Sequence, residues 1–295
     1  MAGQRWRFSI DVGGTFTDCI AASPDGKTHR LKLLSTGRIR SEAVVENHQL
    51  RLRLPFKVAD DVLIGFTCRL YDNHHRLLFE AKVAGWEEAS QTLRLDQSGS
   101  ISEVCSVELD ASQPAPAVAV RILTATPLSR QAEQIDLRLG TTRGTNALLT
   151  RTGADTALIT TRGFKDALTI GTQQRPELFA LEVKRGDTLP SMVVELDERV
   201  DHLGNVLCAL DEEQVRQTLA ELTQSSVTSL AISFLHSYKN PVHELRVAEL
   251  AREAGFDQVS LSHQTSPLVK FIPRANTAVL DAYLNPVLQT YIAEI

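Results

Sequence analysis

The sequence has few cysteines and tryptophans and no long apolar run. Its 295 residues include four cysteines and two tryptophans. The cysteines lie far apart and match no CxxC or zinc-binding spacing, so the sequence predicts neither a disulfide framework nor a zinc site. No apolar run approaches the ~20 residues that a membrane-spanning helix needs, and no signal-peptide core precedes the first apolar segment. We therefore expect a cytoplasmic protein that has no membrane partner.

A strong charge of either sign is also lacking. The formal net charge is −5 at pH 7 and the isoelectric point is near 5.9, which favours neither nucleic acid nor an anionic membrane as a partner. An anionic ligand would therefore have to be held by local geometry. The hydrophobic content of 43% and the charged content of 23% are typical of a globular protein. The length allows two domains with a sizeable core.

The clearest functional signal is the glycine-containing stretch Phe8–Asp18. A short apolar run ends at Asp11 and is followed by Gly13, Gly14 and two threonines. Glycine allows φ > 0 and lets an anion approach the main chain, and consecutive N–H groups in such a turn form an anion-binding concavity. An acid at the strand end suits Mg²⁺, which prefers oxygen ligands. We interpret the stretch as a phosphate-binding hairpin; the alternative is an ordinary glycine hairpin with exposed threonines.

Short strands are expected around this stretch and after it. Apolar alternation and the turn Ser23–Lys27 predict three strands over 7–11, 18–22 and 29–34. Residues 41–117 then differ in character, because alternating segments separated by turns predict a small β-sandwich or barrel. Its expected strands are 50–54, 67–71, 90–95 and 106–110, with a proline-containing linker at 111–116.

A second loop rich in glycine and hydroxyl groups occupies Gly140–Asn146. Free N–H groups at the start of a helix that follows it would favour an anion. The alternative is an N-capped helix in which Thr145 or Asn146 only satisfies the backbone. The elements expected around this loop are a strand over 118–123, a helix near 127–133, a strand over 135–139 and a helix from Ala147.

The remainder of the chain alternates between strand and helix patterns. A strand and a turn are expected over 195–205. The other expected elements are strands over 157–161, 227–235 and 258–263, and helices beginning at Asp211, at Asn240-Pro241 and at Pro273, the last kinked at Pro286.

Two further segments bear on function and on completeness. The polar segment 171–176 contains Gln173 and Arg175, which predict either contacts to a small polar substrate or a solvated surface loop. The chain stops at Ile295 within an apolar helical pattern that has no glycine cap, so we expect a fragment truncated at 295.

Several motifs, taken together, resemble those of a known family. They are Asp11–Asp18, Gly140–Arg151, Thr161–Asp166, Gly171–Pro176, Leu235–Glu244 and Arg274–Pro286. In this order they closely resemble the N-terminal region of the hydantoinase A / 5-oxoprolinase family. The resemblance covers about residues 6–40 and 118–295. We therefore expect an α/β region formed by 1–40 and 118–295, interrupted by an inserted β-rich domain over 41–117.

This resemblance implies a fold and an activity. The fold would be α/β, an actin-like (ribonuclease H-like) ATPase lobe with a mixed sheet. Family members use ATP and Mg²⁺ to open a cyclic amide such as 5-oxoproline or a hydantoin, by phosphorylating the amide oxygen. The resemblance further implies a C-terminal half or a partner subunit of the hydantoinase B type, an oligomer in the full-length form, and an inactive fragment. The alternatives are a subunit of an ATP-dependent ketone carboxylase, a small-molecule kinase, and a non-catalytic nucleotide-binding or assembly module.

The resemblance also assigns roles to individual residues. Asp11 would be catalytic and would hold the metal, with Thr142 and Asn146 as further catalytic residues. The residues expected to bind ATP are Gly13, Gly14, Thr15, Phe16, Thr17 and Asp18. The residues expected to contact substrate are Thr141, Arg143, Gln173 and Arg175.

Overall fold

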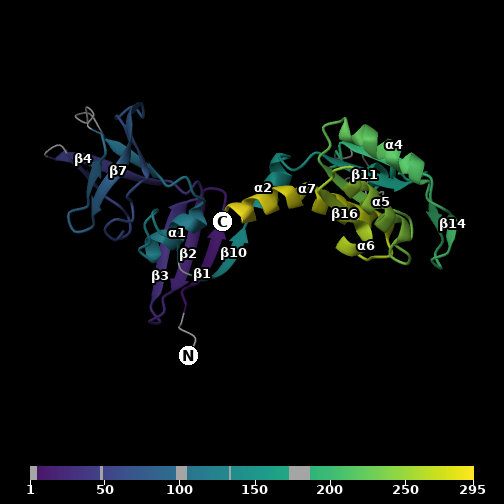
Figure 1. The fold of residues 1–295 in the computed structure, drawn as a ribbon, viewed down its shortest axis with the longest axis horizontal. Coiled ribbons are helices and arrows are strands. Elements are labelled where there is room, and N and C mark those ends of the chain that lie inside the picture. The colour runs from purple at the N-terminus through teal and green to yellow at the C-terminus, as the bar shows by residue number, and fades with distance from the viewer. Residues whose placement is uncertain (1–4, 47–48, 98–104, 133, 173–186) are drawn as a thin grey trace, which may run out of the picture. The chain divides into compact units, whose positions relative to one another are not determined.

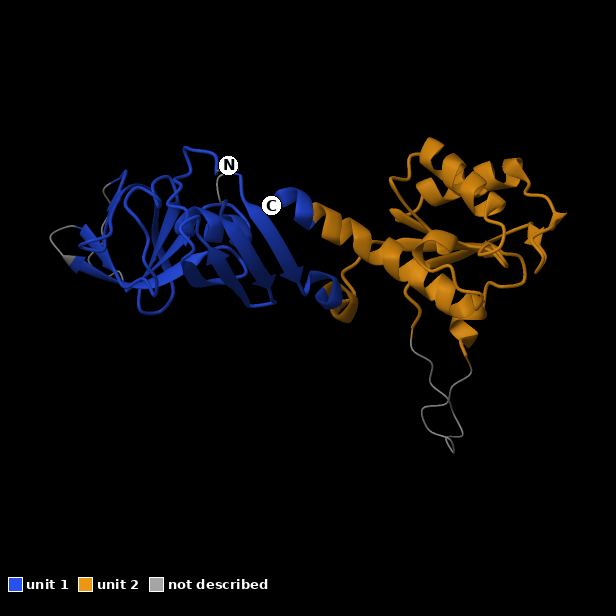
Figure 2. Ribbon diagram, turned by 90° about the horizontal axis from the view of Figure 1, so that it is seen from below, with its two compact units in different colours: residues 1–146, 291–295 blue, residues 147–290 orange. Residues whose placement is uncertain are grey.

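The computed structural model describes residues 5–46, 49–97, 105–132, 134–172 and 187–295. The chain divides into two compact units (Figure 2). Unit 1 comprises residues 1–146 and 291–295, and unit 2 comprises residues 147–290. Among the described residues, none of the helices combines the length and the apolar character that crossing a bilayer requires.

A four-stranded mixed sheet forms one part of unit 1 (Figure 1). The strand order is β10-β1-β2-β3. Strands β1, β2 and β3 form an antiparallel meander, and β10 pairs with β1 in parallel. The three predicted N-terminal strands are thereby confirmed. Their bounds are β1 Arg7–Val12, β2 Phe16–Ala22, β3 Thr28–Leu34 and β10 Asp136–Thr141.

Helix α1 (Ala115–Leu123) packs against β1, β2 and β3. The prediction of a strand over 118–123 was wrong. Val118, Val120 and Ile122 favour a strand by propensity, but they are buried together with Ala115 and Ala119 in the core under the sheet, and such burial overrides propensity. The helix expected near 127–133 is also absent from its described residues, which form turns and irregular chain.

The sheet is covered on one side only within unit 1. Along β1 the side chains alternate, so that Phe8 and Ile10 are buried against α1 while Ser9 and Asp11 are exposed. Strand β2 alternates in the same way, with Cys19 buried. Because side chains of a strand point to opposite faces in turn, the second face of the sheet is open and carries polar side chains together with the exposed Phe16 and Ile20.

Six strands of unit 1 form a closed barrel in the order β4-β5-β8-β7-β6-β9. A small β-sandwich or barrel was predicted, and the structure shows the barrel; strands β4 and β7 were not predicted. Trp86 fills part of the interior and donates through Nε1 to the carbonyl oxygen of Val58 at 2.9 Å. The strands are β4 Ile39–Glu46, β5 Gln49–Leu52, β6 Thr67–Tyr71, β7 Leu77–Glu87, β8 Thr92–Leu95 and β9 Ser106–Asp110.

Unit 2 is built on a parallel sheet with the strand order β12-β11-β15-β16. Helices α4 and α5 pack on one face and α7 on the other. The strands are β11 Thr156–Thr161, β12 Met192–Leu196, β15 Ser229–Ser233 and β16 Gln258–Leu261. The helices are α4 Glu212–Thr223, α5 Val242–Glu253 and α7 Phe271–Glu294.

The smaller elements of unit 2 refine two sequence predictions. The single strand expected after residue 195 is divided between β12 and the hairpin β13 (Arg199–Val200) with β14 (Val206–Cys208). Asp211 caps α4 as predicted, accepting from the N–H groups of Glu213 and Gln214. Two short helices, α3 (Ala167–Ile170) and α6 (Ser262–Thr265), follow strands β11 and β16.

A buried charged network holds the carboxyl ends of β15 and β16. The carboxylate of Glu244 is fully buried and accepts from the N–H of Phe234 at 3.0 Å, from Ser262 Oγ at 2.5 Å and from the N–H of His263 at 3.1 Å. Arg274, also fully buried, donates to Ser262 Oγ and to the carbonyl oxygen of Phe234. One charge of each sign is thus fixed among hydrogen-bond partners inside the unit.

Candidate functional site

Two turns meet at one edge of the mixed sheet in unit 1. Strands β1 and β10 are parallel, so both end at this edge, with Asp11 opposite Gly140 and Val12 opposite Thr141. Strand β2 begins at the same edge, because Val12 also pairs with Thr17. The structure therefore brings the first glycine turn next to the second loop.

The carboxylate of Asp11 is open at this edge. Its side chain is exposed, and within the described part of the chain no hydrogen bond or ion pair uses it. A Cβ atom on Gly140 would lie 3.2 Å from Asp11 Oδ1, so this glycine leaves the room that the carboxylate occupies. Asp18 differs, since Lys32 Nζ lies 3.0 Å from its carboxylate. Asp11 is thus available to a cation from outside, whereas Asp18 already has one.

The glycine turn presents unused N–H groups. The N–H of Gly13 closes the turn by donating to the carbonyl oxygen of Phe16 at 3.0 Å. The N–H groups of Gly14 and Thr15 donate to none of the residues described, and both residues are exposed. Two adjacent donors of this kind suit an anion.

The role expected for the two glycines needs a correction. Neither Gly13 nor Gly14 has a positive φ, so the left-handed conformation is not the reason for glycine here. A Cβ on Gly13 would come within 3.0 Å of the carbonyl oxygen of Phe16, which the turn itself fixes. A Cβ on Gly14 would lie 3.5 Å from Asn146 Nδ2. The glycines therefore supply space within the turn and toward the second loop.

Ser35 stabilises the turn by hydrogen bonds, a role that was not predicted from the sequence. Its Oγ donates to the carbonyl oxygen of Gly13 at 2.8 Å, and its N–H donates to that of Thr15 at 2.9 Å. Thr17 Oγ1 lies 3.0 Å from Ser35 Oγ, and Thr17 is fully buried. The sequence predicted that Thr17 contacts ATP; the structure gives its hydroxyl a partner inside the turn. The role of Ser35 could have been inferred from its position directly after a strand that pairs with the hairpin.

The second loop is fastened to the end of β1. The N–H of Thr142 donates to the carbonyl oxygen of Val12 at 3.1 Å. Helix α2 (Arg143–Thr150) then begins, and Asn146 Nδ2 donates to Thr142 Oγ1 at 3.4 Å. The N–H of Arg143 donates to Thr141 Oγ1 at 3.2 Å. Thr142 and Asn146 are therefore placed beside the glycine turn, while Thr141 caps the helix start.

Arg143 was expected to contact substrate, and the structure places it against an aromatic ring. The guanidinium carbon of Arg143 lies 4.0 Å from the ring centroid of Tyr291, so this cation is engaged with an aromatic face. Burial raises the pKa of Tyr291. Gln173 and Arg175 lie outside the described residues. Nor do the described residues include a cluster of three His, Cys, Asp or Glu side chains able to hold a metal ion.

The sequence matches the family model described as the hydantoinase/oxoprolinase N-terminal region over residues 7–68 and 94–255. The chain belongs to this family. The resemblance inferred from the motifs is thereby confirmed. Residues 69–93, which include β7 of the barrel, lie outside the match to the hydantoinase/oxoprolinase family.

Curated relatives of the chain include enzymes of two kinds. It is 43% identical over 186 residues to a 5-oxoprolinase of Saccharomyces cerevisiae, a match covering 54% of this chain and 14% of the relative. It is 36% identical over 173 residues to the acetophenone carboxylase gamma subunit of Aromatoleum aromaticum, covering 53% of this chain and 24% of the subunit. The chain thus matches only a small part of the length of these relatives.

Solved structures share the fold. A chain of acetone carboxylase, solved in a nucleotide-free form, superimposes with a TM-score of 0.60 at 21% identity, covering 99% of this chain and 34% of that one. The ATP-dependent caprolactamase of Pseudomonas jessenii gives 0.55 at 23% identity, with coverages of 97% and 32%. The expected mixed α/β fold is confirmed.

Proposed function

We propose that this chain is the N-terminal part of an ATP-dependent enzyme that opens a cyclic amide, and that its mixed sheet is an actin-like lobe. The observation that carries the proposal is the open carboxylate of Asp11 beside the unused N–H groups of Gly14 and Thr15. The 43% identity to a 5-oxoprolinase supports a cyclic amide as substrate. The fold shared with an ATP-dependent caprolactamase supports the use of ATP.

The residues at the sheet edge fit a nucleotide with its magnesium ion. The N–H groups of Gly14 and Thr15 would donate to phosphate oxygens, because exposed consecutive donors in a turn bind anions. Asp11 would hold Mg²⁺ directly or through its waters, since this ion commonly uses one or two carboxylates together with phosphates. Bound MgATP would supply the phosphoryl group that makes the amide carbonyl reactive toward water.

The chain's own residues then position the reactants. Asn146 and Thr142, linked by a hydrogen bond, would fix the side of the phosphate site that faces α2. Thr17 and Ser35 would hold the turn in the conformation that leaves its outer N–H groups unused. A preformed set of donors needs no rearrangement when charge develops, which is the main source of electrostatic catalysis.

The rest of the enzyme would come from sequence outside this chain. The match covers 14% of the yeast 5-oxoprolinase, so a C-terminal region or a subunit of the hydantoinase B type would complete the site. We expect the chain alone to be inactive and the complete protein to be a cytoplasmic oligomer. We also keep the division into an α/β region over 1–40 and 118–295 and an inserted domain over 41–117. The unmatched residues 69–93 lie within that range, whereas residues 41–68 and 94–117 match the family.

A carboxylase subunit is the second candidate. It is favoured by the 36% identity to the acetophenone carboxylase gamma subunit and by the fold shared with acetone carboxylase. In that case the same phosphate site would serve to activate a ketone oxygen rather than an amide oxygen.

Substitution of Asp11 in the full-length protein tests the proposal. We expect Asp11→Asn to lower amide-dependent ATP hydrolysis by roughly a hundredfold or more, because a charge that stabilises the transition state is lost, while the circular dichroism spectrum stays unchanged. The matched control is Asp25→Asn, an exposed acid in the turn between β2 and β3. Undiminished turnover in Asp11→Asn would contradict the assignment. Stimulation by ketone with bicarbonate, but not by 5-oxoproline or hydantoin, would favour the carboxylase.

A further inference from the structure

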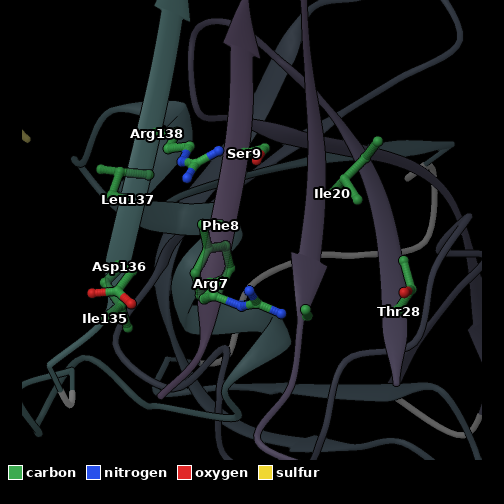
Figure 3. Close-up of a pocket in the computed structure, with 10 residues that line it drawn as sticks. Arg7, Phe8, Ser9, Ile20, Thr28, Ile135, Asp136, Leu137 and Arg138 are labelled. Atoms are coloured by element: carbon green, nitrogen blue, oxygen red, sulfur yellow. The ribbon is translucent and has the colours of Figure 1, made fainter. Parts of the chain in front are cut away.

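The open face of the mixed sheet carries a hollow of about 560 Å³ (Figure 3). Its volume lies within the ~300–1,000 Å³ typical of small-molecule sites. Three of its polar side chains, Arg7, Ser9 and Arg138, come from the neighbouring strands β1 and β10. Ile20 and Ile135 add apolar surface.

The hollow contains two arginines that have no charge partner. The guanidinium groups of Arg7 and Arg138 make no hydrogen bond or ion pair with any residue that the structure describes. Some cations of unit 1 are paired within the described chain, for example Arg40 with the buried Glu108 at 2.9 Å. Asp136 is the single acid among the lining residues. The hollow therefore has an excess of one positive charge, which favours an anionic ligand.

Arg138 and Ser9 lie side by side on this face. They are opposite each other in the parallel ladder, and Figure 3 shows the guanidinium group of Arg138 extending toward Ser9. A guanidinium group binds a carboxylate through two parallel hydrogen bonds, and a hydroxyl can donate a third. These two residues can thus hold the same carboxylate.

The strands that line the hollow also carry Asp11 and Gly140. Asp11 and Ser9 are two residues apart on the same exposed face of β1, and Gly140 and Arg138 have the same relation on β10. Since a strand rises ~3.3 Å per residue, the two rows are roughly 7 Å apart. A small ring anchored at Arg138 by a carboxylate would therefore reach toward Asp11.

We propose that this hollow binds the carboxylate of the substrate and selects anionic cyclic amides over neutral ones. Arg138 forms the paired hydrogen bonds, Ser9 donates the third, and Arg7 supplies a second positive charge. 5-Oxoproline carries such a carboxylate on its lactam ring, whereas hydantoin and caprolactam carry none. The proposal rests on the proposed function and names the substrate class for that same site.

Calorimetric titration of the full-length protein without ATP tests the hollow directly. The probes are 5-oxoproline and 2-pyrrolidinone, the same lactam without its carboxylate. We expect Arg138→Gln to weaken 5-oxoproline binding roughly tenfold to hundredfold, as the loss of charge-assisted hydrogen bonds implies, and to leave 2-pyrrolidinone binding unchanged. The matched control is Arg30→Gln, an exposed arginine on β3 that does not line the hollow; it should change neither affinity more than about twofold.

The titration has outcomes that overturn the proposal. It is overturned if 5-oxoproline does not bind, if it binds no more tightly than 2-pyrrolidinone, or if Arg138→Gln behaves like Arg30→Gln. ATP is a second anionic ligand that the hollow could bind, so a parallel titration with ATP distinguishes the two ligands. Equal weakening of ATP binding by Arg138→Gln would assign Arg138 to the nucleotide instead. Arg138-dependent binding of 5-oxoproline without any amide-stimulated ATP hydrolysis would support the hollow and refute the proposed reaction.

Discussion

Replacing Glu244 by glutamine removes the negative charge from the buried network of unit 2 and keeps the side-chain shape. The glutamine oxygen can still accept from the N–H of Phe234 and from Ser262. Its amide nitrogen, however, meets the backbone N–H of His263, which now donates to Glu244 Oε2 at 3.1 Å. The substitution therefore places two donors face to face and leaves Arg274 buried without a neighbouring anion.

The magnitude follows from these two losses. A buried donor without an acceptor costs about 1–3 kcal/mol, and a buried charge that loses a nearby opposite charge costs about 3–5 kcal/mol. The terms overlap, so we expect Glu244→Gln to lower the free energy of unfolding by about 4 kcal/mol. The matched control is Glu249→Gln on the same helix, where the pairing with Arg246 is exposed; its loss should cost less than about 1 kcal/mol.

The effect of Glu244→Gln on stability also depends on pH. Burial would raise the pKa of Glu244, but hydrogen bonds from His263, Ser262 and other donors outweigh it and hold the pKa below its usual value. A carboxyl with a lowered pKa in the folded state contributes stability above its unfolded pKa of ~4.3. That contribution is lost as pH falls through the folded value. The difference in free energy of unfolding between the wild type and Glu244→Gln should thus be largest at neutral pH and decrease in acid.

Urea unfolding followed by far-ultraviolet circular dichroism measures the change. With a slope of about 2 kcal/mol per molar urea, the transition of unit 2 should move down by about 2 M. Both tryptophans of the chain, Trp6 and Trp86, belong to unit 1, so tryptophan fluorescence provides an internal reference. A shift no larger than that of Glu249→Gln, or an advantage that grows as the pH falls, would refute the reasoning.

Two further predictions concern unit 1 and the cysteines. Gly140→Ala would place a Cβ 3.2 Å from Asp11 Oδ1 and displace the carboxylate by a few tenths of an ångström. We expect turnover of the full-length protein to fall roughly threefold to tenfold while the melting temperature stays unchanged. Unaltered turnover would contradict the placement of Asp11. Burial raises the pKa of Cys19 to about 11 and that of Cys68 to about 12, whereas Cys105 and Cys208 are exposed. A disulfide reagent at mildly alkaline pH should therefore modify two thiols of the folded chain quickly and the other two only after denaturation, and four equally fast thiols would contradict that burial.

The hairpin could be predicted because its signals are local. Strict alternation and the turn Ser23–Lys27 define the strands around Gly13 and Gly14, and a one-residue change of register would expose every buried side chain. Helix α1 could not be predicted in this way. Its residues Val118–Leu123 favour a strand when read alone, and only their burial on several sides, which depends on the rest of the unit, makes them helical.

The barrel shows the same limit. Strand β7 begins with the exposed Leu77 and Leu78, and its pairing with β6 is irregular near Tyr71. Exposed and buried residues alternate only in its middle, over Glu80–Gly85, so the periodic pattern does not reveal the whole strand. The type of fold followed from the shorter regular strands, whereas the full strand set required their pairing.

The candidate site was predicted only where its residues are close in sequence. Asp11 and the second loop could be singled out because glycines and hydroxyl groups follow a predicted strand in each, but their meeting at one edge depends on the pairing of β1 with β10. The hollow on the open face could not, because Arg7 and Arg138 are separated by most of unit 1 in sequence. Their shared face depends on the register between β1 and β10, which no local pattern specifies.

The position of the barrel bears on the order in which the molecule folds. Roughly 130 residues separate Arg7 from its partner Asp136, so pairing β1 with β10 closes a long loop. The barrel begins and returns at adjacent positions, because Ile39 pairs with Leu109. A barrel formed first removes about 70 residues from that loop and lowers its closure cost by about 0.7 kcal/mol. Assembly of the Asp11 edge would then be a late step, and a slow barrel would delay the active conformation without altering a residue of the site.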